Sequence, residues 1–199
     1  MREPVFTEVL KILDGKFYNL RFHLERIFRT STAFYPEPVH IDLSESDIPP
    51  EYRKGIVKCR ITYSGHVTGV EYRHYRFRTV RRLKLVADDT IDYAFKYADR
   101  RDIDTLFSQR RDCDDILIVK NGCITDTSFS NVVFENSSGL YTPASFLLAG
   151  VKRRSLLEQG VIREKEIKAE DVRSYSKLYI INAMTDIGDN ISVDTSNLV

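Results

Sequence analysis

Hydrophobic positions follow two different spacings in the first part of the chain. Every second residue is apolar from Val57 to Tyr63, as in a half-buried strand, whereas apolar residues between Arg21 and Phe34 recur at near-helical intervals. Asp-Gly and Ser-Gly pairs separate neighbouring apolar runs, which is typical of hairpin turns. The elements predicted here are a hairpin around Asp14-Gly15, a helix over 21–34, and strands over 57–63, 67–77 and 83–86.

The second part of the chain has short apolar runs separated by turn residues. Asn121-Gly122 is a strong hairpin signal, and Gly160 ends a helical pattern that opens at Gly150. The elements predicted here are helices over 102–110 and 150–159 and strands over 116–120, 123–125, 131–135, 140–142 and 178–182. Strands and helices mix without a regular βαβ rhythm, so the sequence predicts an α+β fold. A hinge near residue 80 would divide it into a small N-terminal α/β domain, residues 1–79, and a larger C-terminal domain, residues 80–199.

Composition and charge narrow the class of protein. Thirty Lys and Arg residues against 29 Asp and Glu residues leave a net charge of +1, which gives no global attraction to nucleic acid or anionic membranes. Three cysteines without a C-x-x-C spacing disfavour a disulfide framework or a zinc knuckle. No apolar run approaches the roughly 18 residues needed to cross a bilayer, and the charged N-terminus does not match a signal peptide. We therefore expect a cytoplasmic protein that binds neither nucleic acid nor membrane.

Common catalytic motifs do not occur in the chain. The four histidines lack a metal-ligand spacing, so no metal site is predicted, and no Walker loop, dinucleotide fingerprint or G-x-S-x-G is present. Candidate chemistry is therefore confined to five short, separated segments. They are residues 22–26 (FHLER), 95–100 (FKYADR), 121–134 (NGCITDTSFSNVVF), 141–153 with YTP and LAGVKR, and 181–185 (INAMT).

In this order and spacing the five segments resemble the class IV aminotransferases. That family includes branched-chain aminotransferase, D-amino-acid aminotransferase and aminodeoxychorismate lyase, and the resemblance covers most of the chain from about Glu8 onward. Each motif alone is weak, but five in register are specific. The resemblance implies a two-domain D-amino-acid aminotransferase-like fold, shortened at its N-terminus, with pyridoxal phosphate in the cleft between residues 1–79 and 80–199. It also implies a homodimer that completes the pocket across its interface.

The resemblance also assigns roles to individual residues. Lys96 matches the lysine that forms the Schiff base and then acts as general base and acid, and partial burial would favour its uncharged amine. Asp126 stands where the family uses glutamate to keep the pyridine nitrogen protonated. Arg26 matches the phosphate-binding arginine. The other implied cofactor contacts come from the backbone at Val151, Lys152, Ala183 and Met184, with lysine at 152 replacing the family's usual threonine.

Several residues also have plainer interpretations. Asp126 would equally cap the turn into Thr127-Ser128, and Lys96 and Arg26 taken singly are ordinary surface residues. The segment 72–84 interleaves arginines with aromatics, which is typical of a solvated strand or of a nucleic-acid-binding one. A third interpretation is that its arginines bind a substrate carboxylate. Lyases of the family keep a threonine at the position that Val9 occupies here. Its absence argues against lyase activity, unless Thr7 takes the same role.

We therefore expect a pyridoxal-phosphate-dependent aminotransferase that acts on a small amino acid and 2-keto acid pair. Within the family, the alternative is aminodeoxychorismate lyase activity, which eliminates pyruvate. Outside it, the alternative is a degenerate, non-catalytic binding module that uses the basic strand.

Overall fold

A computed structural model describes residues 3–199 of the chain, which divide into two compact units. The first unit runs to Phe77 and also takes in Phe95–Asp99, and the second comprises Arg78–Ala94 and Arg100–Val199. The sequence predicted a single boundary at residue 80, with Lys96 on its C-terminal side. The structure instead groups the segment around Lys96 with the first unit.

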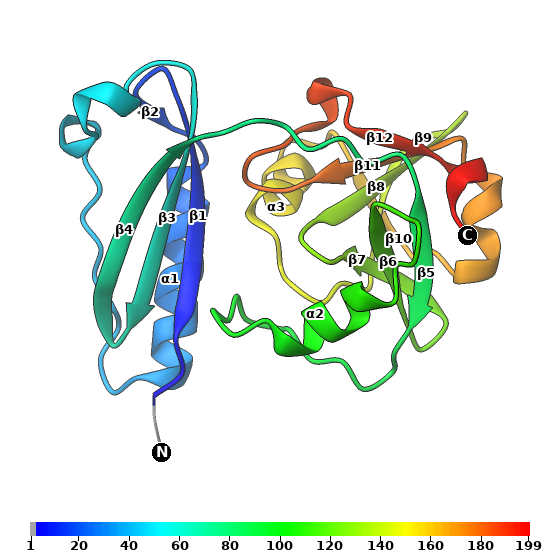
Figure 1. Ribbon diagram of the computed structural model, residues 1–199, viewed down its shortest axis with the longest axis horizontal. Coiled ribbons are helices and arrows are strands. Elements are labelled where there is room, and N and C mark those ends of the chain that lie inside the picture. Colours follow the sequence, from blue (N-terminus) through cyan, green and yellow to red (C-terminus); the bar gives the residue numbers. More distant parts are fainter. Residues whose placement is uncertain (1–2) are drawn as a thin grey trace. The chain divides into compact units, whose positions relative to one another are not determined.

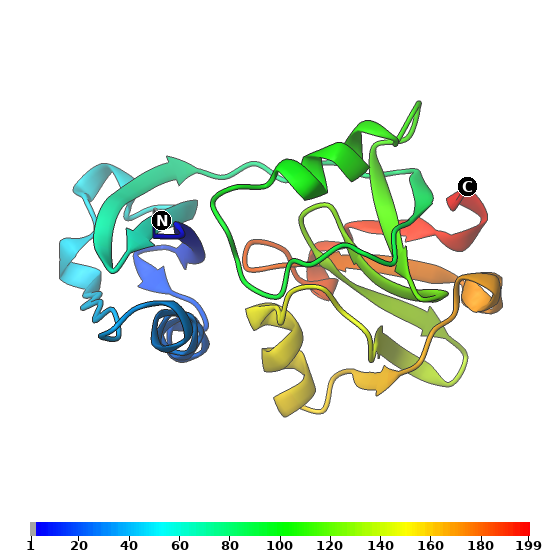
Figure 2. The same ribbon diagram turned by 90° about the horizontal axis from the view of Figure 1, so that it is seen from below.

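The first unit is an antiparallel four-stranded sheet with one helix on a face, in the order β2-β1-β3-β4 (Figure 1). Alternate residues are buried along β3 and, from Glu8 onward, along β1, and Phe6 and Tyr63 pack with Ile27 of the helix. Figure 2 shows this helix nearly end-on below the sheet. The elements are β1 (Phe6–Leu13), β2 (Lys16–Phe17), α1 (Leu20–Phe34), the 3₁₀ helices η1 (Glu45–Asp47) and η2 (Pro50–Tyr52), β3 (Ile56–Ser64) and β4 (His66–His74).

The strand β4 ends at His74 and not at the predicted residue 77. Its partner β3 begins at Ile56, and the Tyr75 N–H makes a last hydrogen bond to the Ile56 carbonyl at 2.8 Å. Beyond this point β3, the strand that pairs with β4, has ended, although the alternation of side chains continues in the sequence.

The segment Phe95–Asp99 covers an edge of β1 that β2 leaves open. Because β2 pairs only with the far end of β1, the backbone groups near the start of β1 need another partner. Thr7 N–H donates to the Lys96 carbonyl at 2.9 Å, and Ala98 N–H donates to the Val5 carbonyl at 2.8 Å. These long-range hydrogen bonds explain why Lys96 belongs to the first unit.

The second unit contains two sheets on a shared core. One has five strands in the order β10-β9-β8-β11-β12, and the other has three in the order β5-β6-β7, with β5 and β6 parallel. Phe134 and Leu178 from the larger sheet pack with Leu83, Leu117 and Ile124 from the smaller one. The elements are β5 (Leu83–Ala87), α2 (Arg101–Ser108), β6 (Asp115–Lys120), β7 (Cys123–Thr127), β8 (Asn131–Asn136), β9 (Gly139–Pro143), α3 (Val151–Glu158), β10 (Arg163–Lys165), η3 (Ala169–Ser174), β11 (Lys177–Ile181), η4 (Ile187–Asp189), β12 (Ser192–Asp194) and η5 (Thr195–Asn197).

The α+β prediction is confirmed, and most predicted strands and helices are present within a few residues of their expected bounds. The sequence missed β10 and β12. Each has three residues, and those of β10 are all exposed, so neither produces a recognisable alternation. Within the described residues 3–199, no helix is long and apolar enough to cross a membrane.

Candidate functional site

Lys96 is half-buried in a segment anchored by aromatic side chains on both sides. Phe95 meets Phe34 edge-on with ring centroids 4.7 Å apart, and the Tyr97 ring lies 5.0 Å from that of Phe6. Together with the backbone bond from Thr7, these contacts hold the lysine backbone between two packed rings. The local sequence shows only aromatic residues flanking a lysine. Their packing partners come from β1 and α1.

A buried charge cluster joins β1 to α1 in the same unit. Glu8, which is 1% exposed, accepts a hydrogen bond of 2.6 Å from His23 Nδ1 and one of 3.0 Å from Arg26 Nε. Arg26 Nη2 also donates to Glu8 Oε1. A bidentate guanidinium–carboxylate pair of this kind is both strong and specific in geometry. Arg26, to which the family resemblance assigned a phosphate, thus has a carboxylate partner in its own unit.

The cluster strongly perturbs its two titratable members. Burial by itself would raise the pKa of Glu8, but the Arg26 charge and the His23 hydrogen bond outweigh it and lower that pKa to about 2. Burial lowers the pKa of His23, the charges of Arg26 and Lys96 act in the same direction, and Glu8 opposes them. Since a carboxylate only accepts hydrogen bonds, His23 carries its proton on Nδ1 in this contact. The cluster therefore holds an ionised glutamate at neutral pH.

Asp126, at the end of β7, is the central polar group in the second unit. Its side chain is buried, and its two oxygens accept hydrogen bonds from Asn131 Nδ2 at 2.9 Å and from Leu148 N–H at 3.0 Å. Burial raises its pKa to about 6 even though both hydrogen bonds favour the ionised form. The simpler interpretation of Asp126 as a turn cap is wrong, because Thr127 Oγ1 accepts from the Phe129 and Ser130 amides instead.

The loop before α3 approaches the Asp126 site closely. Gly150 is the N-cap of this helix, and a Cβ atom there would lie 1.7 Å from Asn131 Oδ1, so a larger residue does not fit. The first-turn amides of Val151 and Lys152 have no acceptor within the helix, as at any helix N-terminus. An anion is the natural partner for such amides because the helix dipole adds to their attraction.

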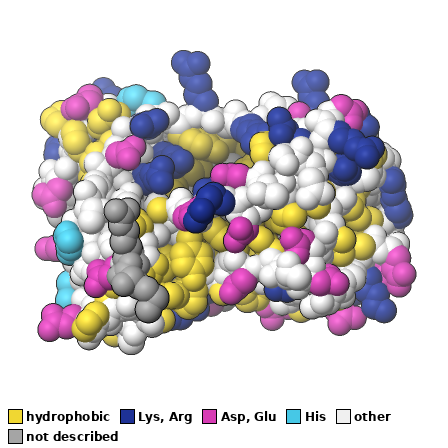
Figure 3. Space-filling model, turned by 60° about the horizontal axis from the view of Figure 1, so that its bottom comes forward, with side chains coloured by type: hydrophobic (Ala, Val, Ile, Leu, Met, Phe, Trp, Pro, Cys, Tyr) yellow, Lys and Arg dark blue, Asp and Glu magenta, His cyan; other side chains and the backbone are white. Residues whose placement is uncertain are grey.

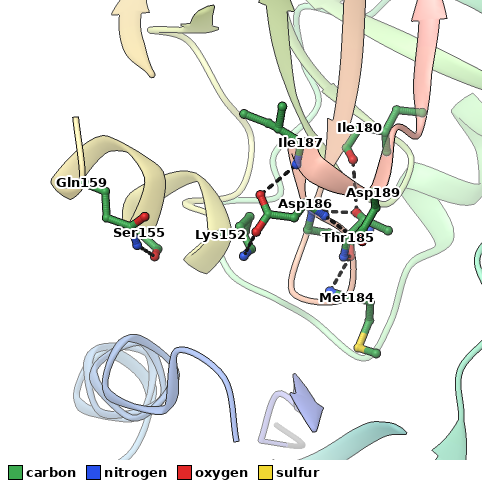
Figure 4. A network of polar contacts seen from close by, with 10 residues as sticks. Lys152, Ser155, Gln159, Ile180, Met184, Thr185, Asp186, Ile187 and Asp189 are labelled. Carbon is green, nitrogen blue, oxygen red and sulfur yellow. Dashed lines mark hydrogen bonds and ion pairs between the residues drawn. The ribbon is translucent and has the colours of Figure 1, made fainter. Parts of the chain in front are cut away.

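Lys152 and the loop after β11 meet in a network of polar contacts (Figure 4). Lys152 Nζ lies 2.5 Å from Asp186 Oδ2, and both Met184 N–H and Thr185 N–H donate to Asn182 Oδ1, at 2.7 and 3.1 Å. The predicted Met184 amide donor therefore already has an acceptor within its own loop. Ala183 lies in the same loop and is half-buried.

The structure thus distributes the predicted site residues over the two units. Arg26 and Lys96 lie in the first, and Asp126, Val151, Lys152, Ala183 and Met184 lie in the second. Sequence reasoning missed the partners Glu8, Asn131 and Asp186. Glu8 did leave a signal, since it occupies a buried position in phase with Phe6 and Leu10.

The part of the chain that the structure describes has no candidate metal site made of His, Cys, Asp or Glu side chains. Residues 3–199 contain no group of three or more His, Cys, Asp or Glu side chains arranged to hold a metal ion.

Comparison with known proteins identifies the family. The family model for amino-transferase class IV matches residues 90–189. An "uncharacterized protein" from Haemophilus influenzae is 36% identical over 187 residues, covering 92% of this chain and 99% of that protein. The crystal structure of a "putative 4-amino-4-deoxychorismate lyase" from Haemophilus somnus 129pt is 32% identical, with a TM-score of 0.82 over 92% of this chain and 98% of that one.

The fold extends to longer relatives as well. The branched-chain amino acid aminotransferase from Escherichia coli superposes with a TM-score of 0.71 at 14% identity, covering 98% of this chain and 77% of that enzyme. The chain therefore has an α+β fold of the fold IV aminotransferase type, and at 199 residues it is shorter than typical members. The protein belongs to the class IV aminotransferase family, whose members typically use pyridoxal phosphate.

Proposed function

We propose that this protein is a pyridoxal-phosphate-dependent aminotransferase that transfers an amino group between a small amino acid and a 2-keto acid, with Lys96 as the residue that binds the cofactor covalently. The observation that carries the proposal is Asp126, a buried carboxylate on β7 that accepts a hydrogen bond from the Leu148 N–H, two residues before the glycine N-cap of α3. Such a carboxylate suits a protonated ring nitrogen, and the helix N-terminus suits a phosphate.

The chemistry of these groups fits the cofactor. Although burial raises its pKa to about 6, Asp126 is mainly ionised at pH 7 and can accept a hydrogen bond from a protonated pyridine nitrogen. Gly150 lacks a side chain where the amides of Val151 and Lys152 begin α3. When bound, pyridoxal phosphate supplies an electron sink for bonds broken at the substrate Cα.

The chain's own residues would divide the remaining work. The Lys96 amine would accept the proton from the substrate Cα and return it to C4′ of the bound cofactor, as general base and then general acid. The Arg26 guanidinium would bind the phosphate while Glu8 fixes its orientation, since Glu8 already holds two of its nitrogens.

Covalent trapping tests the proposal directly. The full chain is incubated with pyridoxal phosphate, reduced with borohydride and digested, and the peptide that carries the cofactor is identified by mass spectrometry. We expect modification of Lys96 in the wild type and none at this position in Lys96→Arg, which keeps the charge but cannot form the bond. Failure of the wild type to incorporate cofactor, or modification elsewhere only, would overturn the proposal.

The lyase activity is a second candidate because of Thr7. This threonine is buried on β1, two positions before Val9, and its N–H donates to the Lys96 carbonyl at 2.9 Å. The relative from Haemophilus somnus carries the name of such a lyase. Pyruvate release from 4-amino-4-deoxychorismate, assayed beside transamination of a panel of amino acids, separates the two activities. If the lyase is correct, Thr7→Val abolishes pyruvate release while the covalent link to Lys96 persists.

The binding-module alternative has less support. Arg82 Nη1 lies 2.6 Å from Asp112 Oδ2, and Lys84 Nζ donates to the Gln109 carbonyl at 2.9 Å, so these two cations have partners. Figure 3 shows acidic side chains scattered among the basic ones on the face it presents. These pairings favour a solvated segment over a nucleic-acid surface.

The homodimer implied by the family stays a prediction. Light scattering on the purified chain tests it, and a monomeric mass at micromolar concentration would contradict it.

A further inference from the structure

The turn between β7 and β8 contacts two other loops through consecutive residues. Ser130 Oγ accepts from Asn182 Nδ2 at 2.8 Å, and Asn182 in turn organises the loop after β11. Asn131, the next residue, donates to Asp126 and to the Leu148 carbonyl before α3. One short turn therefore supports both loops that the family resemblance assigned to the cofactor.

Asn131 has only one orientation that satisfies its surroundings. Its Nδ2 donates at 2.9 Å to Asp126 Oδ1 and at 3.0 Å to the Leu148 carbonyl, and both of those atoms are acceptors. A flipped amide would place its oxygen against two acceptors and lose both bonds. In the observed orientation Oδ1 approaches Gly150 so closely that only glycine fits there. The side chain is thus held by two hydrogen bonds and lies close against Gly150.

We infer that Asn131 is a positioning residue that orients the Asp126 carboxylate and ties it to the 148–150 loop at the start of α3. The inference deepens the proposed function and rests on it, since the orientation of Asp126 matters to the reaction only if a cofactor nitrogen contacts it. Asn131 touches neither substrate nor cofactor in this role and acts through Asp126.

A consequence concerns the ionisation of Asp126. The groups that act on this carboxylate are the Asn131 amide, the backbone N–H groups of Leu147 and Leu148, and the more distant charge of Arg153. All of them favour the ionised form, whereas burial disfavours it and raises the pKa to about 6. Asn131 is the only side chain among them that donates directly to the carboxylate. Its removal should therefore shift the balance toward the protonated form at neutral pH.

The test uses the cofactor-free full chain, so that it does not depend on the proposed chemistry. The ¹³C resonance of the Asp126 carboxyl is assigned by its loss in Asp126→Asn and is then titrated in the wild type, Asn131→Leu and Asn131→Asp. We expect the midpoint to rise by about one pH unit in Asn131→Leu, as for a lost hydrogen bond to a charged group. We expect a larger rise in Asn131→Asp, where a second carboxylate replaces the donor.

A matched control separates positioning from general damage to the turn. Ser130→Ala breaks the neighbouring bond to Asn182 and leaves the Asn131 contact intact, so the midpoint should stay at its wild-type value. Asn131→Ser, which is smaller and fits without overlap, replaces the other variants if they do not fold. A midpoint that stays unchanged in every folded Asn131 variant, or that rises equally in Ser130→Ala, would overturn the inference.

Reconstitution with pyridoxal phosphate then distinguishes a failure of the role inferred for Asn131 from a failure of the proposed function. Cofactor on Lys96 of the wild type with an altered absorption spectrum in Asn131→Leu supports both proposals. Cofactor on Lys96 with an unchanged Asp126 midpoint overturns the role of Asn131 alone. A wild type that takes up no cofactor overturns the proposed function and, with it, any role of Asn131 in the reaction, whatever the titration shows.

Discussion

Replacing Glu8 with glutamine removes the anion at the centre of the buried cluster on β1. Glu8 is 1% exposed and accepts hydrogen bonds from His23 and Arg26. Glutamine keeps the size and one acceptor oxygen, but it replaces the second acceptor with an NH₂ group that faces the guanidinium. The variant therefore leaves Arg26, itself 7% exposed, without the carboxylate that balances its charge.

The magnitude follows from the shifted pKa of Glu8. A change from 4.5 to about 2 spans about 2.5 pH units, and at about 1.4 kcal/mol per unit this equals about 3 kcal/mol at neutral pH. Because the folded pKa lies below the unfolded one, this stabilisation is complete above pH 4.5 and is lost as the pH falls through 2. At pH 3 about half of it should remain. The value of about 3 kcal/mol at neutral pH is comparable with the ~3–5 kcal/mol typically lost when one partner of a buried ion pair is removed.

Urea unfolding between pH 7 and pH 3 measures the effect, since urea does not screen charges as guanidinium would. We expect Glu8→Gln to be about 3 kcal/mol less stable than the wild type at pH 7, with the gap roughly halved at pH 3. Glu71→Gln is the matched control, because Glu71 and its partner Arg73 are 50% and 79% exposed and such pairs contribute about 0–1 kcal/mol. A gap of constant size across this pH range would refute the assignment of Glu8 as a buried, ionised group.

Two further substitutions probe the second unit. Gly150→Ala should lower the free energy of unfolding by about 1–3 kcal/mol in thermal or urea unfolding, because its Cβ would lie 1.7 Å from Asn131 Oδ1. Gly188→Ala is the control. Its Cβ would meet nothing within 4 Å, so it should change the free energy of unfolding by less than about 0.5 kcal/mol. Equal losses of stability in the two alanine variants would contradict the close approach of Gly150 to Asn131. Lys152→Met should cost about 1 kcal/mol or less, because the Asp186 partner is 38% exposed and solvent screens the pair; a loss above about 3 kcal/mol would show that the pair behaves as a buried one.

The local pattern of residues was sufficient to predict most of the secondary structure. Alternation from Val57 to Tyr63 predicted a strand with one buried face, and β3 has that burial pattern. Near-helical spacing after Arg21 predicted α1, and Asn121-Gly122 predicted the turn between β6 and β7. These features depend on contacts between residues near in sequence, so periodicity and turn chemistry report them reliably.

The candidate site was predictable only through the order and spacing of its motifs. Lys96 carries no local sign of its role, and Asp126 has an equally good local interpretation as a turn cap. The spacing of five segments pointed to the family, which the comparisons confirm. The partners of the site residues were not predictable in this way, because Glu8 and Arg26, like Lys152 and Asp186, lie far apart along the chain.

The sequence by itself determined the α+β class, the main elements and the residue types available for chemistry, since these follow from side-chain pattern and motif order. Only the tertiary structure decided that the Lys96 segment completes the edge of β1, that Glu8 neutralises Arg26, and that Asn131 joins Asp126 to the start of α3. The physical reason is that a buried polar group must find its partner wherever folding brings one within hydrogen-bond distance. That partner is chosen by packing and not by proximity along the chain.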